Sequence, residues 1–504
     1  MSKATSTDLY EVTMARSYLR EGMTGPATFS LFVRALPPDR GFLVGAGLES
    51  VLAFLSDYRV DAEDVAAFAS VTGQSCEDMA PLLGLEFEGE VRAVPEGRVV
   101  LAGEPLLEVT APLPQAQLVE TYVLNQVSHQ TAVASKCARC VLAADGRPVV
   151  DFSLRRTHGI EAGHQAARLG AMVGFAGTSD VAAAHAEGLT AVGTMAHSYI
   201  EAFDSEEEAF RAFARSRPGP VTLLVDTYDT VAGVETAAGV LRELGLGPGC
   251  AVRLDSGDLG ALAVRARAVL DAAGLPETRI VASGGLDEYA VDELVRAGAP
   301  IDVFAVGTRI GVSADAPYLD SAYKLVEYDG RPVMKLSSAK VSAPGRKQVY
   351  RRPGRADLIA LADEPAPPGG APLLEPVMRG GRRTSPRTGT AEARRRFTAD
   401  LAALPARARA LRAPAEPRTE LSDRLRSLTS EVRRRIEARL PAEGGGSAPR
   451  GRAGRHGETS DPADRREGTP GRADRRGTGG PVPEGPMTAQ GRTDARRGPV
   501  GPCP

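Results

Sequence analysis

The stretch of sequence that decides the fold begins with VVDFSLRR at residues 149–156 and ends with VFAVGT at residues 303–308. Between them lie five more short apolar runs: MVGFAGTSD (172–180), AVGTMAHS (191–198), VTLLVDTYD (221–229), AVRLDSGD (251–258) and IVASGG (280–285). Each run ends in glycine or in polar residues of kinds used in phosphate binding or acid/base chemistry. This pattern is typical of fully buried parallel strands, because both faces of such a strand are covered and only its carboxyl end meets a ligand. We therefore predict parallel strands whose reactive residues gather at one rim.

Helical patterns separate these strands. Four amphipathic segments are GIEAGHQAARLGAM (159–172), DTVAGVETAAGVLRELG (229–245), LGALAVRARAVLDAAG (259–274) and DEYAVDELVRAGA (287–299). Regular alternation of strand and helix implies right-handed crossovers and a parallel sheet, either closed as a barrel or open and doubly wound. Seven strands with every candidate site at one end favour the barrel. The predicted fold class is α/β, with an irregular parallel barrel that need not close completely.

Four regions are predicted along the chain. Residues 1–130 mix helical segments such as SVLAFLSDY with the strand-rich FEGEVRAVPEGRVVLAGEPLLEVTAPL, as expected of a smaller α+β domain, and a helix over about 115–142 leads into the barrel. Residues 131–350 hold the barrel, and YKLVEYDGRPVMKLS near their end has the Asp-Gly turn of a β-hairpin. Residues 351–440 are predicted to pack back on the small domain. Residues 441–504 contain few large apolar side chains, so we expect a disordered tail there.

The charge balance argues against several classes of partner. The net charge is −3 and charged residues make up 25% of the chain, so nothing global indicates nucleic acid or a membrane surface. The amino terminus, MSKATSTDLYEVTMARSYL, lacks the apolar core of a signal peptide, and no apolar run has the length of a membrane span. We expect a soluble cytoplasmic protein.

The five cysteines form an odd and scattered set, which fits a reducing compartment rather than a disulfide framework. Cys137 and Cys140 make a CxxC pair, but neither a second pair nor a nearby histidine completes a zinc site. SKCARCVLAA is typical of a helix with small buried thiols, so we interpret both cysteines as structural.

Two consecutive glycine turns are candidates for phosphate binding. Ser283, Gly284 and Gly285 lie between a predicted strand and a helix, where backbone N–H groups and the positive helix end can hold a phosphate. Gly307 and Thr308 repeat the arrangement on the next strand. The alternative is that both turns are glycine-rich merely to join strand to helix. Their position at the last strands of a βα series matches the usual phosphate site of barrels.

Candidates for acid/base or nucleophilic chemistry lie at other strand ends. His197, with Ser198 beside it, is predicted to end a strand, where histidine can act as a general acid/base or as a nitrogen nucleophile. Asp226 and Asp255 are expected to face the site, where carboxylates can hold Mg²⁺ or ribose hydroxyls or orient the histidine. The partner aspartates of each DxxD, Asp229 and Asp258, are expected to cap helices.

Arginines supply the balancing positive charge. Arg155, Arg156 and Arg253 lie at or near strand ends, where a planar guanidinium suits a carboxylate or a phosphate. Phe152 offers a face on which a flat heterocycle could stack, although it could equally be barrel core.

In their order, DFSLRRTHG, GTSD, GTMAHS, VDTYD, VRLDSGDL, SGGLDEY and VFAVGT resemble the motif series of nicotinate phosphoribosyltransferases. The segment TDLYEVTMARSYL resembles the opening of that family, and KLVEYDGRPVMKLSSAKVSAPGRKQVYR resembles its segment after the barrel. The resemblance implies a homodimer with an irregular type-II phosphoribosyltransferase barrel and an active site at the subunit interface. It implies that nicotinate and 5-phosphoribosyl 1-diphosphate react to give nicotinate mononucleotide and diphosphate, coupled to ATP hydrolysis, in NAD salvage.

The resemblance also assigns roles to single residues. His197 matches the histidine that ATP phosphorylates, Phe152 an aromatic that stacks on the pyridine ring, and Tyr10 one that closes the other face from the partner subunit. Arg253 and one of Arg155 or Arg156 match groups that hold the nicotinate carboxylate and the sugar diphosphate.

Further roles concern the ribose and its phosphate. Asp226 and Asp255 match acidic residues near the ribose and Mg²⁺. Ser283 to Gly285, together with Gly307 and Thr308, match the loops for the 5′-phosphate of the product. Whether ATP is obligatory, and which of the two adjacent arginines meets the carboxylate, stay open.

Two alternative functions remain. Nicotinamide phosphoribosyltransferase shares the fold and reaction type, and Asp180 in GTSD sits where it could accept a hydrogen bond from an amide, whereas the adjacent arginines favour an acid. A catalytically silent nucleotide-binding relative would be expected to lack His197 or the strand-end carboxylates, and neither is missing.

Overall fold

The computed structural model describes residues 3–336 and 342–439. The chain divides into two units, Met1–Glu437 and Ala438–Pro504, and every helix and strand named below belongs to the first. The tail predicted to be disordered, 441–504, lies outside the described residues.

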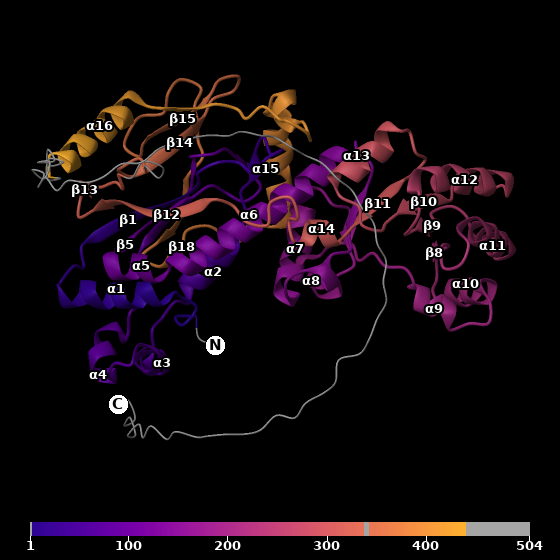
Figure 1. The fold of residues 1–504 in the computed structure, drawn as a ribbon, viewed down its shortest axis with the longest axis horizontal. Coiled ribbons are helices and arrows are strands. Elements are labelled where there is room, and N and C mark those ends of the chain that lie inside the picture. Colours follow the sequence, from indigo (N-terminus) through magenta and orange to yellow (C-terminus); the bar gives the residue numbers. More distant parts are fainter. Residues whose placement is uncertain (1–2, 337–341, 440–504) are drawn as a thin grey trace, which may run out of the picture. The chain divides into compact units, whose positions relative to one another are not determined.

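Short parallel strands from the apolar runs form one curled sheet (Figure 1). Neighbouring strands follow the order β7 (Gly177–Thr178), β6 (Val149–Asp151), β11 (Val303–Val306), β10 (Arg279–Ala282), β9 (Ala251–Leu254) and β8 (Thr222–Leu224). All pairs in this sheet are parallel. The predicted α/β class with an irregular, incompletely closed barrel is thereby confirmed.

One predicted strand, AVGTMAHS, is absent. Its first half lies between the two edge strands instead: Val192 N donates to Thr178 O of β7 at 2.8 Å, and Thr194 Oγ1 donates to Thr222 O of β8 at 3.0 Å. A strand needs successive backbone pairs, and here a side-chain hydroxyl makes the contact with β8. The ring of strands is therefore completed by an irregular segment.

A second strand prediction started too early. Met172 and Val173 belong to the last turn of helix α7 (Ile160–Val173), and the strand β7 begins only at Gly177. The physical reason is that Met172 and Val173 continue the buried face that Leu169 begins on the same helix. An apolar pair at the end of an amphipathic helix cannot be told from a strand start by its hydropathy alone.

The barrel interior is small and apolar. Val150, Ala251, Val281 and Ala305, one from each of four strands, pack together there, and Val192 from the irregular segment packs against them. Short side chains suit this place because the strands converge.

Helices cover the outside of the curled sheet (Figure 1): α7, α8 (Val181–Glu187), α9 (His197–Glu201), α10 (Glu206–Arg215), α11 (Thr230–Glu243), α12 (Leu259–Ala272), α13 (Glu288–Arg296) and α14 (Thr308–Gly311). Aspartate side chains accept hydrogen bonds from first-turn N–H groups at four of them: Asp180, Asp229, Asp258 and Asp287. The predicted capping roles of Asp229 and Asp258 are confirmed. Asp226 and Asp255 cap none of these helices and follow the strands β8 and β9.

An antiparallel sheet forms the other large layer. Its strand order is β13 (Arg331–Pro332), β12 (Ser321–Tyr328), β1 (Pro26–Val33), β5 (Pro105–Pro112), β3 (Glu90–Ala93), β17 (Glu375–Arg379) and β18 (Arg382–Arg383). The predicted Asp-Gly hairpin joins β12 to β13, with Asp329 and Gly330 at φ values of 48° and 70°. Segments from before and after the barrel thus share one sheet.

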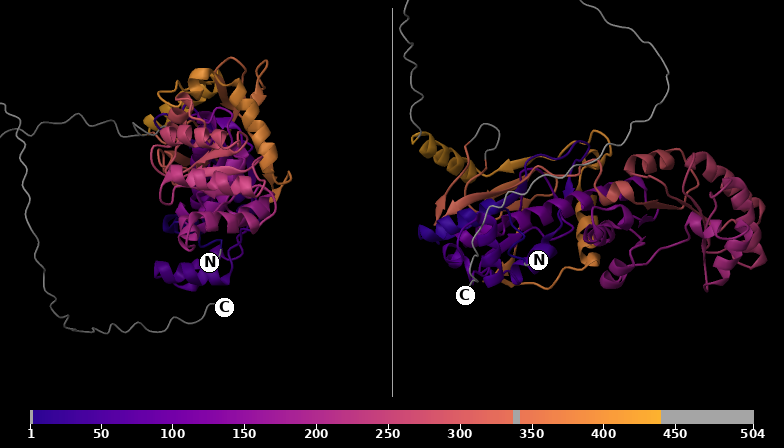
Figure 2. Two further views of the ribbon diagram at one scale, coloured as in Figure 1. Left: turned by 90° about the vertical axis from the view of Figure 1, so that its right-hand side faces the viewer. Right: turned by 60° about the horizontal axis from the view of Figure 1, so that its bottom comes forward.

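Helix α6 (Glu120–Ala143) runs from this sheet to the barrel (Figures 1 and 2). It packs against α2 (Leu48–Ser56) and β2 (Leu43–Val44) on one side and against α7 and α13 on the other. The predicted helix over about 115–142 is present but is divided into α5 (Leu113–Leu118) and α6. α6 is therefore the element through which the two layers are joined.

The remaining elements flank the antiparallel sheet. They are α1 (Leu9–Arg20), α3 (Ala62–Thr72), α4 (Cys76–Met79), β4 (Val99–Val100), β14 (Lys347–Arg351), β15 (Asp357–Leu361), β16 (Ala371–Pro372), α15 (Thr390–Ala403), β19 (Thr419–Leu421) and α16 (Asp423–Glu437). From the C-terminal region, α16 packs on β15 and α15 packs on α7. Among the described residues no helix combines the length and the apolar character needed to cross a bilayer.

Glu104 makes the stability of this region depend on pH. Its side chain is fully buried, and burial raises its pKa well above the ordinary value; nearby Asp357 raises the pKa further and Arg351 opposes the shift. Glu104 Oε1 has no hydrogen-bond donor among the described residues, so nothing compensates at that atom for the burial of a negative charge. A raised pKa contributes stability that is lost as pH rises through the folded-state value.

We predict that Glu104→Gln flattens this dependence. The free energy of unfolding of the wild type should fall as pH rises above about 4.3, the ordinary glutamate pKa, whereas the neutral amide of the variant does not titrate. Urea unfolding across the pH range measures both slopes. Glu235→Gln, on the exposed face of α11, is the control and should keep the wild-type slope. Equal slopes for wild type and Glu104→Gln would contradict the assignment.

Candidate functional site

A pocket of about 390 Å³ lies at the carboxyl ends of the barrel strands. Five of the predicted site residues line it: Phe152, Arg155, His197, Arg253 and Asp255. The other lining residues were not predicted: Leu154, Ser179, Gly193, Thr194, Met195 and Ala196. Most of these belong to the same run as His197, so the position of that histidine was the available signal for them.

His197 lies in the pocket but on a different element from the one predicted. It is the first residue of the short helix α9 and does not follow a strand, because the run before it forms none. Its Nδ1 lies 3.2 Å from Thr227 Oγ1, and its Nε2 lies 4.0 Å from Asp255 Oδ2. One ring nitrogen is thus held by a hydroxyl, and the other faces a carboxylate that would stabilise positive charge on the ring.

Asp255 follows β9 and is the charge centre of the pocket. Its Oδ1 accepts a hydrogen bond from Ser283 Oγ and lies 3.6 Å from Arg253 Nη2. About a third of its side chain is exposed, at 33%. Contacts with Ser283, Arg253 and His197 fix its direction, so its carboxylate is presented to the pocket in a defined orientation.

Asp226, which was expected to face the site, does not line the pocket but bonds the backbone of Asp255 and orients it. Asp226 Oδ2 accepts from Asp255 N at 3.0 Å and from Ser256 Oγ at 2.6 Å. Its Oδ1 is buried and has no hydrogen-bond donor among the described residues. An unpaired buried carboxylate oxygen is costly, and a cation would satisfy it.

Arg253 is the buried cation of the site. Burial lowers its pKa, Asp255 and Asp226 oppose the shift, and Arg155 lowers it further. Arg155 and Arg253 both line the pocket. Arg253 Nε is also without an acceptor in the described part of the chain, and Arg253 Cζ lies 5.9 Å from the ring centroid of Phe152. Two cations beside an aromatic face make a site suited to a flat anion.

The two predicted glycine turns pack directly against these residues. Gly284 has φ of +92°, and a Cβ there would lie 1.8 Å from Asp255 O. A Cβ on Gly307 would lie 2.7 Å from Phe152 O. Both positions therefore need glycine for this close approach, although no residue of either turn lines the pocket. The positive end of α13, however, is not free to hold a phosphate, because its Tyr289 and Ala290 N–H groups are bonded to Asp287. In this respect the expectation is wrong, and only the backbone of the turns is available there.

The structure separates several other predicted residues from the pocket. Arg156 and Ser198 are exposed and do not line it, whereas Arg155 does. Thr308 begins α14, next to Gly307. Tyr10 is 46% exposed and lines a different pocket, beside Tyr318 and His129.

Asp180 is buried and already engaged. Its Oδ1 accepts from Ala183 N at 3.0 Å as the cap of α8, and its Oδ2 lies 2.6 Å from His164 Nδ1. The His164 ring lines a separate cavity of about 480 Å³ between α2 and α8. Asp180 therefore supports the local fold and has no contact with the pocket.

Cys137 and Cys140 are buried free thiols on α6. Among the described residues, no three His, Cys, Asp or Glu side chains gather into a metal-binding group. The burial of both thiols on a helix agrees with their interpretation as small buried side chains.

Comparison with protein families gives two matches along the chain. Residues 5–128 match the model of the nicotinate phosphoribosyltransferase N-terminal domain, and residues 148–349 match that of the nicotinate phosphoribosyltransferase family. Among curated proteins, the chain is 49% identical over 382 residues to the nicotinate phosphoribosyltransferase pncB2 of Mycobacterium tuberculosis, covering 75% of this chain and 82% of that protein. It is 39% identical over 377 residues to the Bacillus subtilis nicotinate phosphoribosyltransferase, covering 71% and 76% of the two chains.

Solved structures give the same picture. Human nicotinic acid phosphoribosyltransferase superimposes with a TM-score of 0.73 at 30% identity, covering 84% of this chain and 99% of the human one. A nicotinate-nucleotide pyrophosphorylase from Pyrococcus furiosus superimposes with a TM-score of 0.66 at 26% identity, covering 79% and 95%.

Proposed function

The chain belongs to the nicotinate phosphoribosyltransferase family, and from this premise we propose that it converts nicotinate and 5-phosphoribosyl 1-diphosphate to nicotinate mononucleotide and diphosphate. The reaction would serve NAD salvage from nicotinic acid. The single observation that carries the proposal is the pocket that joins Phe152, Arg155, Arg253, Asp255 and His197. An aromatic face, two guanidinium groups, a carboxylate and a histidine are the groups that this reaction requires.

Recognition of the acid follows from the charges in the pocket. Arg155 and Arg253 both line the pocket, and Arg253 Cζ lies 5.9 Å from the ring centroid of Phe152, so a planar anion placed on the ring would meet positive charge there. The nicotinamide alternative needs an acceptor for the amide. Asp180, the candidate for that role, already accepts from Ala183 N and pairs with His164 outside the pocket.

The transfer step requires stabilisation of a cation-like sugar. As the bond from ribose C1 to diphosphate breaks, positive charge develops on the ring, and the nicotinate nitrogen then forms the new bond to C1. The Asp255 carboxylate, held by Ser283 and Arg253, is the group that can stabilise that charge without reorganising. Arg155 and Arg253 would help to neutralise the leaving diphosphate.

A magnesium ion is proposed as the cofactor. The free, buried Oδ1 of Asp226 and the partly exposed carboxylate of Asp255 fit it, because Mg²⁺ is usually bound through one or two carboxylates together with substrate phosphates. When bound, the ion would neutralise charge on the diphosphate. Asp226 and Asp255 would hold it, and Asp226 would at the same time keep Asp255 in place through its backbone N–H.

ATP is proposed as a co-substrate that phosphorylates His197. A nitrogen of His197 would take the terminal phosphoryl group with release of ADP, and later hydrolysis would return free histidine and phosphate. Thr227 Oγ1, 3.2 Å from Nδ1, can hold the ring while Nε2 remains on the side of Asp255. The free energy of this cycle would be used to tighten the complex with nicotinate, which is a weak nucleophile.

A homodimer is proposed to complete the site. Tyr10 does not line the catalytic pocket of its own chain but is 46% exposed on α1, beside the exposed Leu9 and near Tyr318. Exposed aromatic side chains of this kind are frequent in interfaces. In the proposed dimer, Tyr10 of one chain closes the free face of the pyridine ring in the other.

One assay tests the proposal: release of diphosphate by the purified protein with nicotinate or with nicotinamide, with and without ATP. We expect kcat/KM for nicotinate to exceed that for nicotinamide by at least about 100-fold, because the amide leaves the arginines without a partner. ATP should raise the rate with nicotinate. Preference for nicotinamide would overturn the assignment of substrate, and absence of diphosphate release with either pyridine would overturn the assignment of reaction.

A further inference from the structure

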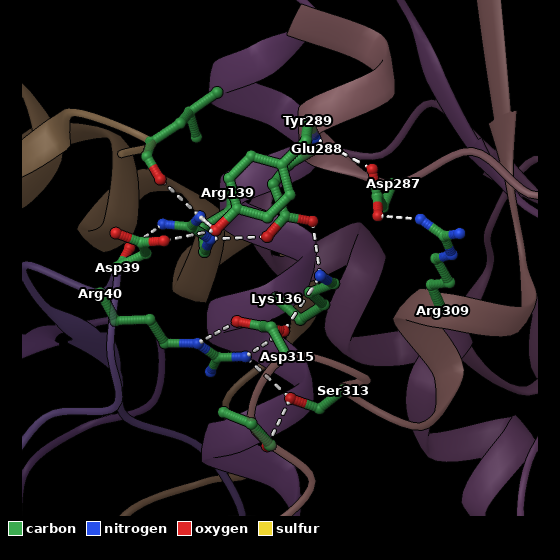
Figure 3. A network of polar contacts seen from close by, with 12 residues as sticks. Asp39, Arg40, Lys136, Arg139, Asp287, Glu288, Tyr289, Arg309, Ser313 and Asp315 are labelled. Atoms are coloured by element: carbon green, nitrogen blue, oxygen red, sulfur yellow. Dashed lines mark hydrogen bonds and ion pairs between the residues drawn. The ribbon is translucent and has the colours of Figure 1, made fainter. Parts of the chain in front are cut away.

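A buried network of charges joins α6, α13 and the segment after α14 (Figure 3). Its cations are Arg40, Lys136 and Arg139, and its carboxylates are Glu288 and Asp315. Arg139 also donates to the backbone oxygen of Asp39. Lys136 and Arg139 lie one turn apart on α6, Glu288 is the first residue of α13, and Asp315 follows α14. Three positive and two negative charges thus connect four separate segments.

Lys136 is the centre of this network. Its Nζ donates to Glu288 Oε2 and lies 3.0 Å from Asp315 Oδ1. Lys136 is 1% exposed and Glu288 is fully buried, so neither charge is stabilised by water. Arg139 Nε donates to the other oxygen of Glu288 at 2.8 Å, and Arg40 binds Asp315 through Nε and Nη2, both at 3.0 Å. Lys136 is therefore the group that joins the Glu288 pair to the Asp315 pair.

The two carboxylates that Lys136 holds lie just beyond the two turns. Glu288 is three residues after Gly285, and Asp315 lies in the loop after the short helix that Thr308 begins. A second contact connects the same two segments directly, since Arg309 Nη1 donates to Asp287 Oδ2 (Figure 3). The C-terminal ends of both turns are therefore fixed to α6 and to each other.

We propose that Lys136 is a positioning residue that sets the spacing of the turns at Ser283–Gly285 and Gly307–Thr308, and thereby the affinity for the 5′-phosphate of the sugar. This inference rests on the proposed function and on the expectation, drawn from the family resemblance, that the 5′-phosphate binds at these turns. Lys136 does not line the catalytic pocket, so it acts through Glu288 and Asp315 and not through the substrate. Without the ammonium group the two carboxylates would repel each other in a place from which water is excluded.

The test is Lys136→Met, which keeps the length of the side chain and removes the charge. We expect the KM for 5-phosphoribosyl 1-diphosphate, and its dissociation constant by calorimetry, to rise at least about tenfold, because small displacements of a positioned group weaken binding strongly. The KM for nicotinate should change less than about twofold, because Phe152 meets only the backbone of the Gly307 turn and neither Phe152 nor Arg155 bonds a charged side chain of the network.

Lys347→Met is the matched control. Lys347 is a second buried lysine, 4% exposed, whose Nζ lies 3.4 Å from the buried Glu108 in the antiparallel sheet. Its removal should lower the melting temperature as Lys136→Met does, yet leave both KM values unchanged. A variant that only lowers the stability of the fold would not raise the KM for 5-phosphoribosyl 1-diphosphate while leaving the KM for nicotinate unchanged.

Three outcomes decide the matter. Unchanged affinity for 5-phosphoribosyl 1-diphosphate in a folded Lys136→Met would overturn the inference. If that variant does not fold, Asp315→Asn, at a side chain that is 15% exposed, is measured in its place, and again an unchanged affinity would overturn the inference. A wild-type protein without transferase activity would contradict the proposed function alone, and calorimetry with inorganic phosphate would then decide whether Lys136 positions the turns.

Discussion

Asp255→Asn is expected to lower kcat by about 100- to 1000-fold, the loss typical of removing one preorganised electrostatic contact to a transition state. Asparagine has the size of aspartate, and its side-chain oxygen can still accept the hydrogen bond from Ser283. The substitution therefore keeps the shape of the side chain and removes the negative charge beside Arg253 and His197, which is also the charge proposed to hold Mg²⁺. Steady-state rates of diphosphate release, with both substrates saturating, measure the effect.

Asp258→Asn is the control for this substitution. Asp258 lies three residues further along the chain and caps α12 by accepting from Ala261 N at 3.1 Å. Asparagine caps helices as well as aspartate does, so rate and stability should both stay near the wild-type values. A wild-type rate in Asp255→Asn would show that this carboxylate supports the fold rather than the reaction.

His197→Ala is expected to abolish the stimulation by ATP while some phosphoribosyl transfer persists. The proposed role of His197 is to accept a phosphoryl group, and alanine has no nucleophile. At low nicotinate the rate with ATP should fall about tenfold or more, to the value that the wild type shows without ATP. Labelling with ATP that carries radioactive phosphorus in its terminal phosphate should mark the wild type and leave the variant unmarked.

His185→Ala supplies the comparison, because His185 is exposed on α8 and lines no part of the catalytic pocket. It should retain both labelling and stimulation. Full stimulation by ATP in His197→Ala would refute the role of the histidine, even if the overall rate were reduced.

The fold was largely predictable from local patterns. Buried parallel strands are nearly continuous apolar runs, and the runs around Val149, Leu223, Val252, Ile280 and Phe304 lie where the strands are found. AVGTMAHS has the same composition but forms no strand, because Thr194 makes its contact with β8 through a hydroxyl. A hydrogen bond made by a side chain in place of a backbone group does not change the hydropathy pattern, so the sequence could not show it.

The site was predictable where residues follow strands and less so elsewhere. Phe152, Arg253 and Asp255 follow or end strands and line the pocket as expected. His197 was assigned to the pocket for a partly wrong reason, since it begins a helix. Asp180 was considered as an amide acceptor, but its pairing with His164, sixteen residues earlier, depends on how α7 and α8 pack and could not be inferred from spacing.

Lys136 shows the other limit of sequence interpretation. Nothing in SKCARC indicates that this lysine is buried, since its partners Glu288 and Asp315 lie 152 and 179 positions away along the chain. Charges buried through such long-range pairs become visible only when the helices are packed.

Because the barrel closes irregularly, one side of the pocket is held by more hydrogen bonds than the other. Asp255, Ser283 and Gly307 stand on strands that are bonded to neighbours on both sides, whereas the residues leading to His197 are tied to β8 by one threonine hydroxyl. Local opening is least costly where the fewest bonds must break. The segment that carries His197 is therefore expected to open locally more easily than the strands that carry Asp255, Ser283 and Gly307. A phosphoryl group would be transferred to and from His197 while the residues proposed to bind the sugar stay in position.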